Sequence, residues 1–110
     1  MTCSAEDLLE LRTICPGAEP MTDGPLHLVY LPSLRVLSDG KEHAVDGLLC
    51  LTTHKGYVTR LYLSRSFQQK QANWRVEQLV GRAWHSWSWQ GVPALHRPAA
   101  ILAQHLRALR

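Results

Sequence analysis

Between Gly81 and Leu102 the sequence reads GRAWHSWSWQGVPALHRPAAIL, a span with three of the four tryptophans and two of the six histidines. It also contains two serines, Ser86 and Ser88, close to His85. A hydroxyl beside an imidazole can carry out acyl transfer when an acid orients the imidazole. The span has no acid and no G-x-S-x-G elbow, and Asp46 is the nearest candidate that the fold could bring across. We therefore expect packing or recognition here rather than hydrolysis.

The tryptophans of this span favour a mixed role. In an extended AWHSWSW segment, Trp87 and Trp89 point to one side and Trp84 to the other. A tryptophan anchors a small core well, so we expect two of the three to be core residues. An exposed remaining indole would mark a protein-binding surface. The predicted partner-binding residues are Trp84, His85, Trp87 and Trp89.

The histidines and cysteines of this chain are not spaced to bind one metal ion together. His43, Cys50 and His54 lie close in sequence, but strand alternation would set Cys50 and His54 about 13 Å apart, too far to share an ion. The three cysteines, which include Cys3 and Cys15, are odd in number and form no C-x-x-C pair. We therefore expect no metal site, no cofactor and reduced thiols in the cytoplasm.

Composition narrows the class of protein. A chain of 110 residues suits one domain. A net charge of +3 with scattered basic residues argues against nucleic-acid binding. No stretch approaches the roughly 20 apolar residues of a membrane helix, and the acidic N-terminus lacks a signal-peptide pattern. We expect a cytoplasmic protein with no membrane or nucleic-acid partner.

Helix signals stand near both ends of the chain. Ser4, followed by two acids and by leucines at helical spacing, predicts a short amphipathic helix that ends at Pro16-Gly17. Pro98 suits the first turn of a second helix. The apolar face of that helix is expected to contain Ile101, Leu102, His105, Leu106 and Leu109.

Strand signals fill the middle of the chain. We expect a loop at 18–25 and four strands at 26–37, 44–54, 57–64 and 74–84, with a bend or bulge at Pro32 in the first. Asp39-Gly40 and Lys55-Gly56 predict short turns, which require antiparallel neighbours. The expected fold class is α+β, with an N-terminal helix, a four-stranded antiparallel meander and a C-terminal helix. The two helices should cover the sheet.

Two stretches resemble the ubiquitin-conjugating (E2, UBC-like) superfamily, which has an N-terminal helix, a four-stranded meander, an active-site segment and a helix. LLCLTTHKGYVTRLYLS is similar to the stretch around the superfamily's Gly-Tyr-Pro turn, with Gly56 and Tyr57 matching and Val58 in place of proline. GRAWHSWSW followed by ILAQHLRAL resembles the Trp-rich stretch and last helix of prokaryotic E2 family E. The resemblance covers residues 24–110 and implies a UBC-like fold, with residues 1–110 as a single E2-like domain.

The thiol of a catalytic E2 is missing from the matching segment. In that family the cysteine falls at or near Trp84 and His85, and no cysteine follows Cys50 in this chain. Cys50 lies in a predicted strand, where we expect it to be buried and inert. The resemblance therefore implies an E2-like component of a bacterial ubiquitin-like conjugation system, linked to anti-phage defence, that acts mainly by binding. The implied partners are an E1-like adenylating enzyme, the ubiquitin-like modifier and a JAB-type peptidase.

Two alternatives stay open at this point. The chain could be an active E2 that uses an atypical nucleophile, and the weak catalytic candidates are His85, Ser86 and Cys50. It could also be an unrelated α+β protein-binding module whose tryptophan cluster packs a dimer.

Overall fold

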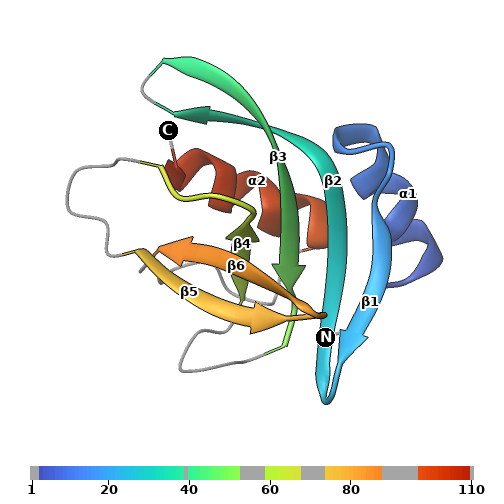
Figure 1. Cartoon of the computed structure of the whole chain (residues 1–110). Coiled ribbons are helices and arrows are strands. Elements are labelled where there is room, and N and C mark those ends of the chain that lie inside the picture. Colours follow the sequence, from blue (N-terminus) through green and yellow to red (C-terminus); the bar gives the residue numbers. More distant parts are fainter. Residues whose placement is uncertain (1–2, 39, 53–58, 68–73, 88–96, 110) are drawn as a thin grey trace.

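The chain forms an α+β fold in which two helices cover one face of an antiparallel sheet (Figure 1). The computed structural model describes residues 3–38, 40–52, 59–67, 74–87 and 97–109. Its elements are α1 (Ala5–Ile14), β1 (Glu19–Asp23), β2 (Leu26–Ser38), β3 (Lys41–Cys50), β4 (Arg60–Leu63), β5 (Trp74–Leu79), β6 (Arg82–Trp87) and α2 (Pro98–Leu109). The predicted α+β class and both predicted helices are confirmed.

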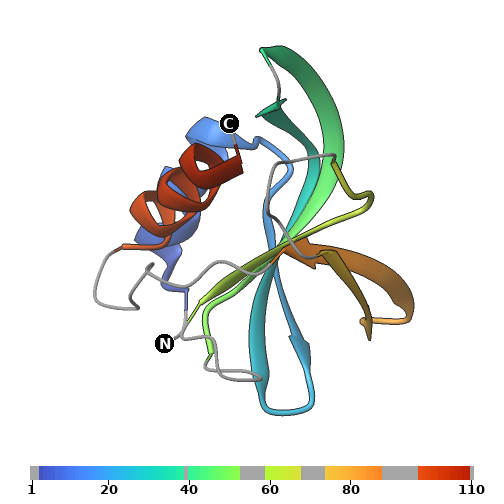
Figure 2. The same ribbon diagram turned by 90° about the vertical axis from the view of Figure 1, so that its left-hand side faces the viewer.

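The sheet is strongly twisted and has the strand order β1-β2-β3-β4-β6-β5 (Figures 1 and 2). Every neighbouring pair in this order is antiparallel. Both helices pack on one side of it, while the β5–β6 hairpin bends away from them (Figure 2). No helix within the described ranges is long and apolar enough to cross a membrane.

Helix α1 begins with the predicted cap. The Ser4 hydroxyl accepts the Asp7 N–H at 3.1 Å, and the Asp7 carboxylate accepts the Ser4 N–H at 3.1 Å. This reciprocal pair satisfies two of the N–H groups that have no partner inside the helix. The helix ends at Cys15, whose N–H bonds to the Leu11 carbonyl at 2.8 Å, and Pro16 then prevents its continuation.

The described part of the sheet has six strands rather than the four expected. The predicted loop at 18–25 contains β1, which pairs with β2 from Glu19↔Tyr30 to Asp23↔Leu26. The single strand expected at 74–84 is a hairpin, because Val80 and Gly81 turn the chain with φ angles of 44° and 80°. A β-branched residue rarely adopts positive φ, so Val80 carried no turn signal.

The other turn predictions have mixed outcomes. Ser38 pairs with Lys41 and Gly40 has a φ of 73°, which confirms the two-residue hairpin turn between β2 and β3. Asp39 itself, the turn at Lys55-Gly56 and the first residues of the strand expected at 57–64 lie outside the described residues.

A bulge in β2 keeps the apolar residues on both sides of Pro32 in the helix-side core. The register shifts between Leu31 and Leu34, as expected at Pro32, and Ser33 has a φ of 53°. The Asp46 carboxylate holds the bulge by accepting the Ser33 N–H at 3.1 Å. One extra residue reverses the alternation, so Leu31 and Leu34 both face the helices.

Each face of the sheet has its own apolar cluster. The helix-side core contains Leu11, Cys15, Ala18, Val29, Leu31, Leu34, Val36, Val45, Leu49, Leu51, Leu61, Leu63, Phe67, Trp87, Ile101, Leu102 and Leu109. The second core lies on the opposite face and contains Leu26, Leu28, Leu48, Cys50, Tyr62, Leu79 and Trp84. The second core joins the β5–β6 hairpin to the long strands, and the Asp23 carboxylate supports this contact by accepting the Val80 N–H at 2.8 Å.

Candidate functional site

The tryptophan-rich span forms β6, and strand alternation sends its indoles to opposite cores. Trp84 is fully buried in the second core, where its Nε1–H donates to the Leu79 carbonyl at 3.1 Å. Trp87 is 4% exposed and lies in the helix-side core. The prediction that two of the three tryptophans are core residues is confirmed by this pair. Trp89 and Ser88 lie outside the described residues.

Trp87 belongs to a row of aromatic rings along the helix-side core. Its ring centroid lies 5.4 Å from that of Trp74 and 6.4 Å from that of His105. Phe67 lies 6.4 Å beyond Trp74, and His43 lies 5.0 Å beyond Phe67. These contacts account for Trp74 and Trp87 by packing. A partner could therefore reach neither the Trp84 nor the Trp87 indole without opening a core.

His85 and Ser86 do not form a catalytic pair with an orienting acid. His85 is half-buried and pairs with Leu63 in β4 and Val76 in β5, whereas Ser86 is 2% exposed. Asp46 instead accepts the Ser33 N–H and lies 3.4 Å from the Arg82 guanidinium. Among the described residues, no hydrogen bond joins Asp46 to His85. The arrangement gives a serine or histidine nucleophile no activation.

The three thiols are also poorly suited to nucleophilic attack. Cys50 is fully buried in β3, its Sγ–H donates to the Thr52 carbonyl at 3.2 Å, and burial raises the pKa of its thiol. Burial likewise raises the pKa of Cys15, which donates to the Pro32 carbonyl at 3.1 Å. Burial and the nearby Asp7 carboxylate raise the pKa of Cys3. A raised pKa keeps these sulfurs as thiols, whereas thioester chemistry needs a thiolate.

Metal-ligating side chains do not gather in the described part of the chain, where no group of three His, Cys, Asp or Glu residues could hold an ion. His54, one of the residues weighed as a ligand, lies outside that part.

A buried polar cluster joins α2 to the start of β4. The expected position of His105 on the apolar face of its helix is confirmed, but its polar neighbours were not predicted. His105 is 1% exposed, and its Nε2 lies 3.0 Å from the Thr59 hydroxyl. Arg60 is 5% exposed and its guanidinium lies 5.7 Å from the Tyr62 ring. Burial, with a smaller contribution from the Arg60 charge, lowers the pKa of His105 to about 4. All four residues of β4 are buried, so both of its faces, including the position of Arg60, are covered.

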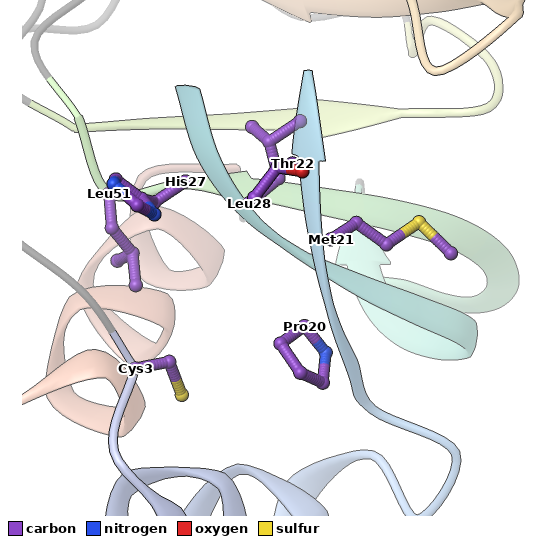
Figure 3. Close-up of a pocket in the computed structure, with 7 residues that line it drawn as sticks. All are labelled: Cys3, Pro20, Met21, Thr22, His27, Leu28 and Leu51. Atoms are coloured by element: carbon purple, nitrogen blue, oxygen red, sulfur yellow. The ribbon is translucent and has the colours of Figure 1, made fainter. Parts of the chain in front are cut away.

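A cavity of about 240 Å³ opens at the end of the sheet near β1. Its lining comes from the chain before α1, from the β1–β2 hairpin and from the residue after β3 (Figure 3). The lining residues are Cys3, Pro20, Met21, Thr22, His27, Leu28 and Leu51. Figure 3 shows Cys3 at one side of this cavity and the His27 ring near Leu51 at another. None of the predicted site residues in β6 lines it.

Comparison with known proteins adds no assignment, because no family model, curated protein or solved structure matches this chain.

Proposed function

We propose that the chain is a small E2-like component of a bacterial ubiquitin-like conjugation system, which binds an E1-like enzyme or the modifier and forms no thioester. The order of elements supports this proposal. An N-terminal helix precedes strands β1 to β4, which are neighbours in sequence order, and a last helix packs on the same face as the first. A UBC-like domain has the same succession of helix, four-stranded meander and closing helix.

The β5–β6 hairpin carries the functional part of the proposal. It occupies the place between the fourth strand and the last helix where an E2 has its active-site segment. Here that segment supplies Trp84 and Trp87 to the two cores. Ser86, which lies between these tryptophans in the sequence, is also buried. A segment that is committed to packing can stabilise a docking domain, and the hydroxyl of Ser86 within it is inaccessible.

The alternative of an active E2 is less well supported. Cys50 would have to leave the second core to react, and its raised pKa disfavours the thiolate. Ser86 would need a general base, and His85, its neighbour in the same strand, points to the opposite face. In this proposal the remaining implied partner, a JAB-type peptidase, binds the modifier and contacts this chain only indirectly.

An adduct assay tests the proposal. The chain would be incubated with ATP, an E1-like enzyme and a ubiquitin-like modifier from its own host, and resolved on gels with and without reductant. We expect no adduct. A reductant-sensitive band that is lost in Cys50→Ser would establish a thioester enzyme, and a reductant-resistant band that is lost in Ser86→Ala would establish an oxyester enzyme. Cys15→Ser is the matched control, since Cys15 is also buried.

A further inference from the structure

The outer edge of β5 is an open edge of the sheet in the described part of the chain. β5 ends the sheet, and no described strand lies on its far side (Figure 1). The two-residue turn at Val80-Gly81 makes Leu79↔Arg82 a hydrogen-bonded pair, so alternate residues of β5 direct their N–H and C=O groups away from β6. These outward residues are Trp74, Val76 and Gln78, each of which has both a donor and an acceptor.

The side chains of this edge do not protect it. Val76 is 59% exposed, a large fraction for an apolar residue at the centre of a strand. Edge strands are commonly protected by proline, charged side chains, shortness or a bulge; β5 has no proline, lysine or bulge, and its two charges, Arg75 and Glu77, are of opposite sign. The opposite edge differs, because the same turn geometry directs the backbone of Pro20 outward in β1, where proline has no N–H to donate.

The charges of β5 select a second copy of the same strand. In an antiparallel pair centred on Val76, Arg75 of each copy lies opposite Glu77 of the other. The outward backbone groups then form the hydrogen-bonded pairs, and the two charged pairs take the non-hydrogen-bonded positions, where side chains are closest.

Neighbouring registers are disfavoured by the same charges. The outward backbone groups meet only when the register shifts by two residues at a time. One such shift sets Arg75 opposite Arg75, and the other sets Glu77 opposite Glu77. Like charges directly opposite destabilise a strand pair.

We propose that two copies of this chain associate through their β5 strands, in an antiparallel register centred on Val76, and so extend the sheet across a twofold axis. The interface uses one edge of each copy, so the assembly closes as a dimer and does not continue as a fibre. Within its own chain, the Glu77 carboxylate also accepts a hydrogen bond from the Tyr62 hydroxyl at 2.7 Å, which holds it in position. The inference does not depend on the proposed docking function.

Sedimentation velocity over a range from low micromolar to millimolar concentration tests the dimer. The wild-type chain should shift from monomer to dimer, whereas Arg75→Glu should raise the dissociation constant by roughly tenfold or more, since it makes both charged pairs repulsive. Val76→Pro should abolish association, because it removes the central outward N–H. Arg107→Glu, an equal change of charge at an exposed position of α2, should leave association unchanged.

A mixing experiment tests the proposed register of the two β5 strands. Arg75→Glu and Glu77→Arg should each be weak as homodimers, but their mixture restores both opposite-charge pairs and should associate as a heterodimer. Circular dichroism confirms that each variant is folded. A wild-type chain that remains monomeric at every concentration would overturn the proposal. So would folded variants whose mixture fails to associate, or a dimer unchanged by both Arg75→Glu and Val76→Pro.

Discussion

Acidification should destabilise this protein through one buried imidazole, that of His105. Its pKa is about 4 in the folded chain, against an ordinary value of 6.5. Between these two pH values the His105 imidazole binds a proton in the unfolded chain and stays neutral in the folded chain. The free energy of unfolding therefore keeps its full contribution from the neutral His105 above pH 6.5 and loses that contribution as the pH falls toward 4.

The size of the effect follows from the two pKa values. A shift of one unit corresponds to about 1.4 kcal/mol, so the difference between about 4 and 6.5 amounts to about 3 kcal/mol below pH 4. About 2 kcal/mol of this should already be lost at pH 5. Small domains commonly have about 5–15 kcal/mol of total stability, so the loss would lower the unfolding midpoint clearly.

Urea unfolding at a series of pH values from 7 to 4 measures this, with His105→Gln as the comparison. Other acids titrate in both proteins, so the quantity of interest is the difference in unfolding free energy between wild type and variant. The amide can still meet the Thr59 hydroxyl but does not titrate. We expect the free energy of unfolding of the wild type, minus that of His105→Gln, to fall by about 2 kcal/mol between pH 7 and pH 5. A difference that stays constant, or an imidazole that titrates near 6.5 by NMR in the folded chain, would refute the reasoning.

Three substitutions test the packing. Leu102→Ala removes a fully buried side chain of α2 and should cost about 2–5 kcal/mol in urea unfolding; an unchanged midpoint would mean that α2 is peripheral. Gly17→Ala would set a Cβ 2.6 Å from the Pro32 Cγ, and the rigid ring cannot rotate away, so a loss of about 1–3 kcal/mol is expected by the same method. Val80→Asn should raise the melting temperature by relieving about 1 kcal/mol of strain at a φ of 44°; a lower melting temperature would mean that the packing of the valine outweighs this strain.

Local signals predicted the helices well because their causes are local. Ser4 and Asp7 satisfy each other within one turn, and Pro98 begins α2 where its missing N–H costs nothing. The Gly40 turn was predictable for the same reason, since glycine adopts positive φ readily.

The hairpin at Val80 was not predictable from such rules. Its support comes from the Asp23 carboxylate, which is distant in sequence and accepts the Val80 N–H. A contact of this kind stabilises a backbone conformation that valine itself disfavours, and nothing in the flanking sequence reveals it. The second core has the same origin, because it forms only when the β5–β6 hairpin meets β2 and β3.

The candidate site shows the same division between local and distant causes. Alternation along β6 was enough to send Trp84 and Trp87 to opposite faces. The pairing of His105 with Thr59 needed the packing of α2 on the sheet, which no spacing in the sequence encodes.

The proposed function requires that this chain bind an E1-like enzyme or a ubiquitin-like modifier without forming a covalent adduct. Native mass spectrometry of the chain mixed with the E1-like enzyme, the modifier and ATP, followed by denaturation of the same sample, tests it most directly. We expect a complex at the summed mass in the native spectrum and the unmodified mass of the chain after denaturation. A denatured species heavier by the mass of the modifier, or the absence of any complex, would contradict it.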